Sequence, residues 1–221
     1  YAINGPGIKD GKDEPGEAGM LSFENAIDNN NNKAVGSRVG MLPLSNSSLE
    51  IGFSGYYAKP GNEQSPYKNV TASLAAVDLS YVKLISPVKG IIDIKGQYNI
   101  SNVSNAIYFN PEDTTPYTFI NSSSAYYAQL AYRPAMAGND ALKNIEIVSR
   151  YSAYNTPEGA LWESIQSQLS VGVNYWFTWR TVLKTSLLQT TIEKGNANAN
   201  GGHSHGGTTG NMFLVHLAVG L

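Results

Sequence analysis

The fold class is decided by Met212-Phe-Leu-Val-His-Leu-Ala-Val-Gly-Leu221, a stretch in which large apolar residues recur with a period of two. Successive side chains of a β-strand point to opposite faces of a sheet. One face of this strand would carry only large apolar side chains, namely Phe213, Val215, Leu217, Val219 and Leu221. The other face would be small, polar or mixed, with Gly220, Ala218, His216, Leu214 and Met212. A transmembrane β-barrel has this pattern, because one face meets lipid and the other meets the lumen.

The composition of the chain excludes several classes of protein. Only 14% of its 221 residues are charged and the formal net charge is -2, so a basic surface for nucleic acid is not expected. The chain has no cysteine, which excludes disulfides and thiolate sites. It has no apolar run of about 18 residues, as a transmembrane helix requires. The abundance of tyrosine (14) and glycine (22) is typical of the interfacial girdles and close strand packing of membrane barrels.

Turn-forming and strand-forming residues divide the chain into two parts. Residues 1–35 are rich in Gly, Pro, Asn and Asp, which predicts a loop-rich segment: an extracellular loop or a remnant of preceding strands. Residues 36–221 contain about nine stretches with strand character, which predicts an all-β antiparallel sheet. These stretches are 36–42, 48–58, 68–84, 88–101, 118–133, 143–154, 165–178, 180–192 and 211–221.

The connectors between these strands alternate in length. Short connectors fall near 43–47, 85–87, 134–142 and 178–179, and longer polar ones near 59–67, 102–117, 155–164 and 193–210. Outer-membrane barrels join their strands by short periplasmic turns and long extracellular loops. Aromatic residues also gather near strand ends, as in Tyr175-Trp-Phe-Thr-Trp179, where headgroup-level girdles would lie. We therefore expect 36–221 to be outer-membrane β-barrel strands, with 193–210 outside the cell.

Alternation also separates charged from apolar residues within single strands. Ile92 and Ile94 oppose Asp93 and Lys95, and Ile145 and Ile147 oppose Glu146 and Arg150. A mid-strand charge is costly against lipid but is hydrated in a wet lumen. We therefore expect a set of charged residues to line a pore or, alternatively, to form a salt-bridge network that fills the lumen. That set is Arg38, Glu50, Asp93, Lys95, Glu146, Arg150 and Lys184.

The strand number suggests that the printed sequence is incomplete. Bacterial barrels of a single chain have an even number of strands, so at least one strand is expected before residue 1. The sequence also begins at Tyr1 without an initiator Met or a signal peptide. We expect the C-terminal strands of a larger transmembrane barrel of about 16–18 strands. The alternative is a secreted β-sandwich, as in an adhesin-like module.

Three stretches resemble the C-terminal half of phosphate-selective porin O/P-like proteins and related Bacteroidetes porins. They are Ser37–Gly55, Ile145-Glu-Ile-Val-Ser-Arg-Tyr-Ser152 and Gln168-Leu-Ser-Val-Gly-Val-Asn-Tyr-Trp-Phe177. The resemblance covers 36–221 and implies an outer-membrane porin with strand–turn–strand units and an acid and an arginine in the lumen. The predicted lumen mixes both signs, including Asp78 beside Arg38, so phosphate selectivity is not carried over.

Other chemistry has little support in the sequence. His203 and His205 lie two apart in a glycine-rich loop and could chelate a transition metal weakly, but two ligands do not complete a site. The chain has neither a G-x-S-x-G elbow nor an H-E-x-x-H motif, so we do not expect an enzyme or a cofactor.

The function expected from the sequence is passive diffusion of small hydrophilic solutes or ions across the bacterial outer membrane. Its expected partners are membrane lipid, these solutes, and further copies or other outer-membrane subunits. The alternative is a structural or accessory barrel subunit that holds a surface complex together.

Overall fold

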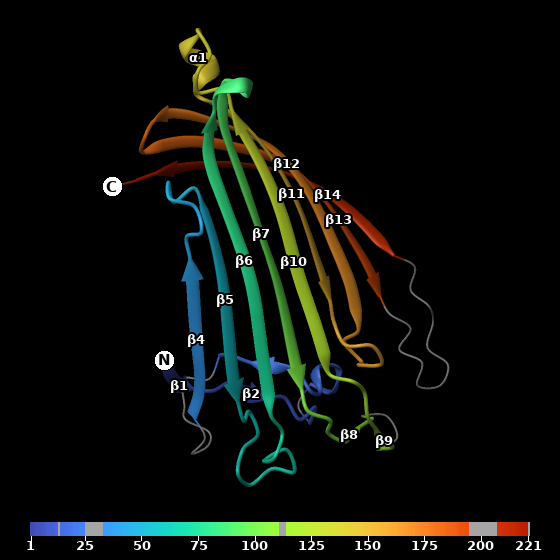
Figure 1. Cartoon of the computed structure of the whole chain (residues 1–221). Helices are drawn as coiled ribbons and strands as arrows, with labels where there is room; N and C mark the ends of the chain where they lie inside the picture. Colours follow the sequence, from blue (N-terminus) through green and yellow to red (C-terminus); the bar gives the residue numbers. More distant parts are fainter. Residues whose placement is uncertain (13, 25–32, 111–113, 195–206, 221) are drawn as a thin grey trace.

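The structure is a computed structural model that describes residues 1–12, 14–24, 33–110, 114–194 and 207–220. It is all-β apart from short helical turns, and it is built around one ten-stranded antiparallel sheet (Figure 1). Neighbours in this sheet follow the order of the chain, interrupted only by small hairpins. The sheet strands are β1 (Ala2–Asn4), β4 (Lys33–Met41), β5 (Leu49–Ala58), β6 (Ala72–Ile85), β7 (Gly90–Val103), β10 (Ser122–Arg133), β11 (Ile145–Asn155), β12 (Ser164–Thr178), β13 (Thr181–Lys194) and β14 (Thr208–Val219).

The all-β antiparallel prediction is confirmed, and the strand bounds differ mainly at the ends. β4 begins at Lys33 rather than at 36, and β6 and β10 begin about four residues later than their alternation predicts. The larger difference is β1, which pairs with β4 through Ala2↔Val35 and Asn4↔Lys33 inside the segment expected to be loop. Three residues are too few for a period of two to be recognised, so the sequence pattern missed this strand.

Successive connectors alternate between the two ends of the sheet, as a meander requires (Figure 1). One end, called here the turn end, carries 42–48, 86–89 with η2 (Ser86–Val88), 134–144 with α1 (Asp140–Lys143), and 179–180. The other, called the loop end, carries the described residues of 5–24, 59–71, 104–121 and 156–163. The separation by length is incomplete, because 134–144 at the turn end is longer than 156–163 at the loop end. Most of the predicted loop 193–210, with His203 and His205, lies outside the described residues. Among the described residues, no helix combines the length and apolar character needed to cross a bilayer.

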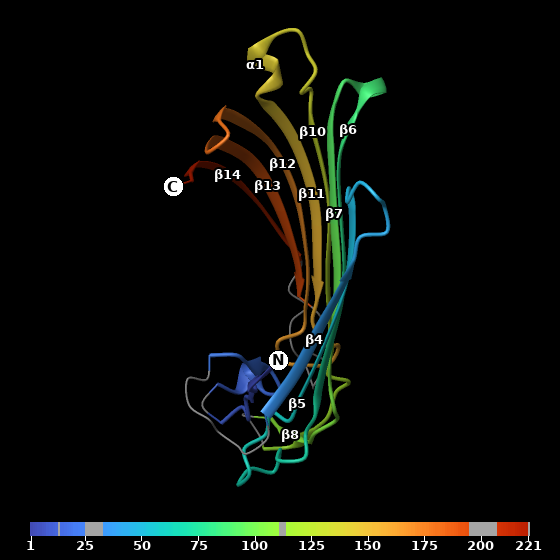
Figure 2. The ribbon, with the colours of Figure 1, turned by 60° about the vertical axis from the view of Figure 1, so that its left-hand side comes forward.

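The sheet is strongly curved, and the N-terminal segment (residues 5–24) sits on its concave side at the loop end (Figure 2). This segment contains the hairpin of β2 (Gly7–Ile8) and β3 (Leu21–Ser22), joined through η1 (Pro15–Glu17). Because β1 runs antiparallel to β4, the segment is the connector between these two strands. It therefore belongs to the same series as the other long connectors at that end.

The buried core of the molecule lies at the loop end, where the connectors meet the N-terminal segment. Its aromatic cluster consists of Tyr67, Tyr108, Tyr117, Phe119 and Trp162. The rings of Tyr67 and Phe119 stack on Tyr108 at centroid distances of 5.6 and 5.1 Å, and Trp162 meets Phe119 edge-on at 6.4 Å. The second short hairpin is formed by β8 (Tyr108–Phe109) and β9 (Pro116–Tyr117). It supplies the rings of Tyr108 and Tyr117. Aromatic packing thus joins three separate connectors.

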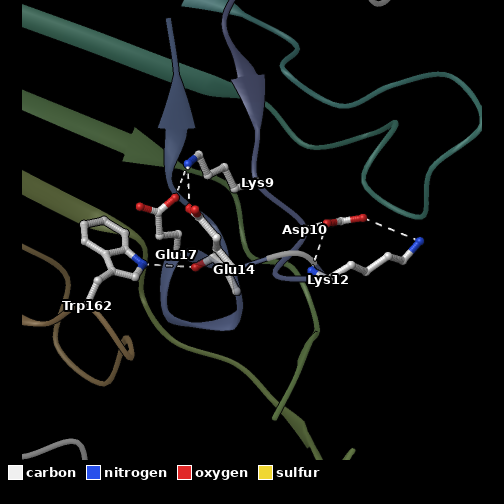
Figure 3. A network of polar contacts seen from close by, with 7 residues as sticks. Lys9, Asp10, Lys12, Glu14, Glu17 and Trp162 are labelled. Atoms are coloured by element: carbon white, nitrogen blue, oxygen red, sulfur yellow. Dashed lines mark hydrogen bonds and ion pairs between the residues drawn. The ribbon is translucent and has the colours of Figure 1, made fainter. Parts of the chain in front are cut away.

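Polar contacts attach the N-terminal segment to this cluster (Figure 3). The indole N–H of Trp162 donates to the Ala18 carbonyl oxygen at 3.0 Å, and the Asn121 side-chain amide donates to the Gly19 carbonyl oxygen at 2.8 Å. Gly19 has φ +85° and lies against the rings of Tyr108 and Phe119, where a Cβ atom would come within 2.9 Å of both. A side chain at this position would be strained and would collide with the cluster.

An ion pair closes the turn inside the N-terminal segment. The Lys9 ammonium group contacts the carboxylate of Glu17 and also that of Glu14, the latter at 3.3 Å (Figure 3). Hydrogen bonding to Lys9 lowers the pKa of Glu17, and hydrogen bonding to Glu17 raises the pKa of Lys9. The three side chains lie on one short turn, so the pair holds the shape of the segment rather than attaching it to the sheet.

The loop end should lose stability at high pH because of Tyr108. This side chain is fully buried, and burial raises its pKa from 10.0 to about 12, although the Asn121 side chain opposes the shift in part. Between these values the unfolded state has lost the phenolic proton while the folded state keeps it. The stabilisation is therefore complete below pH 10 and is lost as the pH rises toward 12, with a magnitude on the order of 2 kcal/mol.

Urea unfolding measured on both sides of this pH range, with tryptophan fluorescence as the probe of Trp162, tests the expectation. Tyr108→Phe should flatten the fall in the free energy of unfolding. Tyr98→Phe is the matched control, because Tyr98 is 45% exposed, and it should retain the fall. Equal curves for both variants would show that Tyr108 is not the group responsible.

Candidate functional site: the polar concave face

The register of the sheet sorts the strand residues onto two faces. Directly paired residues of antiparallel strands have their side chains on the same face. Phe53 pairs with Val77, Val77 with Tyr98, and Tyr98 with Tyr126, so these four side chains share one face. The alternate residues share the other face, as in the series Ser54, Ala76, Asn99 and Ala125. We call the two faces the apolar face and the polar face.

The apolar face is exposed across the sheet. Leu130 on β10 and Ile147 on β11 are each 54% exposed, and Phe213 on β14 is 61% exposed. No second layer covers this face among the described residues, since the other sheets are two-stranded hairpins. Other exposed side chains of this face are Val39, Tyr57, Leu79, Ile94, Tyr151, Leu169, Val171, Val173, Leu187, Val215 and Leu217.

Aromatic residues flank the aliphatic part of this face. On β10, Tyr126 and Tyr132 stand on either side of Ala128 and Leu130, about 20 Å apart at ~3.3 Å per residue. At the level of Tyr126, Tyr98 pairs with it directly and the ring of Tyr151 lies 6.1 Å away. This spacing resembles the apolar band of about 25 Å between aromatic girdles in outer-membrane barrels.

Charged side chains of the strands divide unequally between the faces. On the apolar face, among strand residues whose side chains are described, they occur only near strand ends, at Lys33, Lys83 and Glu193. The polar face carries charges in the middle of its strands, as at Arg38, Asp78, Lys95 and Arg150, and also near strand ends, as at Glu50, Arg133 and Glu146. Its basic residues are Arg38, Lys95, Arg133, Arg150 and Lys184, and its acidic residues are Glu50, Asp78, Asp93 and Glu146.

Many of these residues lie in continuous rows that cross several strands. The first row runs through six directly paired residues, Glu50, Ser80, Lys95, Gln129, Arg150 and Ser170. The second row runs through Glu146, Asn174, Lys184 and His216. Neighbours in a row lie about 5 Å apart across the sheet. The rows therefore bring charged residues from distant parts of the chain onto one hydrated surface.

A salt bridge occupies the beginning of this surface on β4 to β6. The guanidinium group of Arg38 donates to both carboxylate oxygens of Asp78, one of them at 2.7 Å, and lies 3.7 Å from Glu50. Gly52 lies beneath this pair, because a Cβ atom there would come within 2.5 Å of both Arg38 and Asp78. The glycine on β5 thus leaves room for an arginine of β4 to reach an acid of β6.

The remaining charged residues form smaller contacts farther along the sheet. Lys95 donates to Asp93 at 2.9 Å, and the Asn174 amide donates to Glu146 at 2.7 Å. The guanidinium carbon of Arg150 lies 4.0 Å from the centre of the Tyr127 ring, in cation–π geometry. Acids and bases therefore alternate in small groups, and neither sign dominates the face.

All of the predicted pore-lining residues fall on the polar face. The structure brings Glu50, Lys95 and Arg150 into the first row and Glu146 and Lys184 into the second, with Asp93 between them. Arg38 lies outside these two rows and forms a salt bridge with Asp78. Two further charged residues belong to this face. Asp78 was expected in the lumen but was not among the predicted pore-lining residues, and Arg133 was not predicted.

A sequence signal for both omitted residues existed. Asp78 alternates with the apolar residues Val77 and Leu79. Arg133 lies two positions after Ala131 and therefore on the same face of β10.

Metal chemistry has no site among the described residues, because no group of three or more His, Cys, Asp or Glu side chains is placed to hold an ion. His203 and His205 lie outside this part of the chain. His216 lies on the polar face of β14 and pairs in register with Lys184. No family model, no curated protein and no solved structure matches the chain.

A pair of adjacent lysine substitutions separates a lipid-facing surface from a merely exposed one. Leu130→Lys places a charge in the middle of the apolar face, whereas Gln129→Lys places it on the polar face of the same strand. A lysine at the bilayer midplane costs about 2–4 kcal/mol in a barrel, while a surface substitution in water changes stability by less than about 0.5 kcal/mol. We expect Leu130→Lys to impair folding into vesicles and Gln129→Lys to have little effect.

The measurement is the urea dependence of folding into phosphatidylcholine vesicles, followed by heat-modifiable gel migration. Equal stabilities of the two variants would contradict a lipid-facing role for the apolar face. Folding of the protein in buffer without detergent or lipid would favour a water-exposed sheet.

Proposed function

We propose that this chain forms part of an outer-membrane β-barrel and that its polar face lines a water-filled path for small hydrophilic solutes or ions. The observation that carries the proposal is the segregation of side chains across the whole sheet. Among the strand residues whose side chains are described, mid-strand charges lie on the polar face, and the charges of the apolar face lie only near strand ends. A lipid bilayer outside and water inside would impose this distribution.

A soluble sandwich accounts less well for the apolar face. The largest apolar patch of a typical soluble monomer is about 300–600 Å², and a sandwich buries its apolar face under a second sheet. Here exposed apolar side chains extend from Val39 on β4 to Val219 on β14, and no second large sheet covers them among the described residues. Lipid is the proposed partner of this face.

The two edges of the sheet support closure by additional strands. β1 and β14 each have one neighbour in the sheet. An unpaired strand edge is not stable within hydrocarbon, because its backbone N–H and C=O groups have no water to bind. We therefore propose that further strands, from a longer chain or from another subunit, close a barrel of about 16–18 strands.

The distribution of connectors supports one orientation. In outer-membrane barrels the short turns face the periplasm and the long loops face outward. We place the turn end, with 86–89 and 179–180, in the periplasm and the loop end at the cell surface. The N-terminal segment and the aromatic cluster would then lie at the outer mouth of the path.

The balanced charges favour a general diffusion path over a strongly selective one. Acidic and basic side chains on opposite parts of a lumen orient solutes, and the net sign sets ion preference. Around the first row, Glu50 and Asp93 offset Lys95 and Arg150. A change of one charge in this row should therefore alter ion preference measurably.

A charge reversal tests this function. Planar-bilayer recordings of the natural full-length protein should show stepwise conductance. In Arg150→Glu the reversal potential in a salt gradient should shift toward cation preference, because a base is replaced by an acid in the first row. The matched control is Lys143→Glu, which makes the same charge change in α1 at the turn end and should shift the potential less.

Two results would count against the proposal. A bilayer without conductance would favour an accessory barrel subunit, and copurification of a stoichiometric partner at high salt would support that alternative. Conductance with identical ion preference in both variants would show that the first row does not line the path.

A further inference from the structure

A cavity of about 400 Å³ lies at the loop end between the N-terminal segment and the sheet. Met20, Leu21 and Phe23 form one wall. The polar faces of β5, β6, β7 and β10 form the other, including Tyr56 and Asn99. Cavities that bind small molecules typically have volumes of about 300–1,000 Å³. The space is therefore adequate for one small ring compound or two linked rings.

The chemistry of this cavity differs from that of the rest of the polar face. No side chain that lines it is charged. Arg38 adjoins it, because its guanidinium group donates to the hydroxyl of Ser54 in the lining at 3.4 Å, but this group is already paired with the carboxylate of Asp78. A charged ligand would lose its hydration there without gaining a counter-ion. The ligand that fits is consequently neutral.

Aromatic rings line the cavity from several elements. Tyr56 comes from β5, Tyr154 from β11 and Trp162 from the connector 156–163. Phe23 packs near Tyr56 with a centroid distance of 6.5 Å. The Trp162 indole is held in place by its hydrogen bond to the Ala18 carbonyl oxygen. Fixed aromatic faces provide flat apolar surfaces on which the C–H face of a ring compound can pack.

Neutral polar groups stand among these rings. Asn99, Ser101, Asn121 and Ser123 supply amides and hydroxyls that can bind hydroxyl groups. The hydroxyl group of Tyr56 is buried and out of reach of a ligand, so Tyr56 contributes its ring to the lining.

We propose that this cavity is a binding subsite for a neutral saccharide, of one or two sugar rings, at the outer mouth of the path. Sugars combine apolar C–H faces with hydroxyl groups, and the cavity combines aromatic faces with uncharged amides and hydroxyls. The inference rests on the proposed function, because it names the class of solute that the mouth would hold before it enters the charged part of the lumen.

Asn99→Leu is the decisive variant, because it replaces an uncharged amide of the lining by an apolar side chain of similar size. If the amide binds a sugar, the variant should bind glucose or maltose about 3–10-fold more weakly, as expected for one lost hydrogen bond. Asn102→Leu is the matched control on the opposite face of β7, and its sugar affinity should equal that of the unmodified protein.

Isothermal titration calorimetry of the natural full-length protein in detergent gives the affinities, with glucose, maltose and the anion gluconate as probes. The neutral sugars should bind and gluconate should bind more weakly. Binding of neither sugar, or equal sugar affinity in Asn99→Leu and Asn102→Leu, would overturn the subsite. Conductance without sugar binding would refute the subsite while leaving the diffusion path intact, and sugar binding without conductance would refute the path alone.

Discussion

The rest of the structure depends on one geometric constraint, the direct register of an antiparallel meander over ten strands. Each pair of neighbours keeps the two faces separate, so a series such as Phe53, Val77, Tyr98 and Tyr126 stays on one side of the sheet. A slip of one residue between two strands would move every following apolar side chain to the other face. Where the described pairing does shift, between Trp176 and Thr178, it does so at the turn end of β12, beyond the two polar rows.

This constraint explains why charges that are distant in the chain lie together. Glu50 and Arg150 belong to strands separated by three others, yet they occupy one row because each intermediate pairing is direct. Local contacts then differ from place to place along the sheet. Arg38 crosses Gly52 to reach Asp78, while Arg150 packs on the Tyr127 ring. The polar face thus combines salt bridges with a cation–π contact, and the partner of each charge depends on its local neighbours.

The loop end follows a different physical rule. Its connectors cannot use a β-ladder to satisfy one another, so they are joined by stacked rings and by side-chain hydrogen bonds to the backbone. Tyr108, Phe119 and Trp162 come from two connectors, and Trp162 and Asn121 both bind carbonyl groups of the N-terminal segment. The result is an uncharged, aromatic-lined region at one end of an otherwise charged face.

The sequence by itself determined the antiparallel all-β fold and the two faces of the strands that alternate cleanly, whereas 118–133 and 180–192 carry Ser, Thr and Gln on both faces. Alternation over strands such as Ser164–Thr178 is a local property, and lipid or water on either side of a sheet imposes it residue by residue. This is why Lys95, Glu146 and the other predicted pore residues could be assigned to a common face. Their arrangement in two rows could not be read from the chain, because it depends on the pairing offset of each strand with its neighbour.

Only the tertiary structure decided the place of the N-terminal segment. Residues 5–24 carry turn chemistry but no period, so nothing in them shows that Ala18 and Gly19 meet Trp162 and Asn121, more than a hundred positions later. The same holds for the short β1 and for the cavity beside Tyr56. Contacts between irregular segments are set by packing of the folded sheet and its connectors, which no local pattern records.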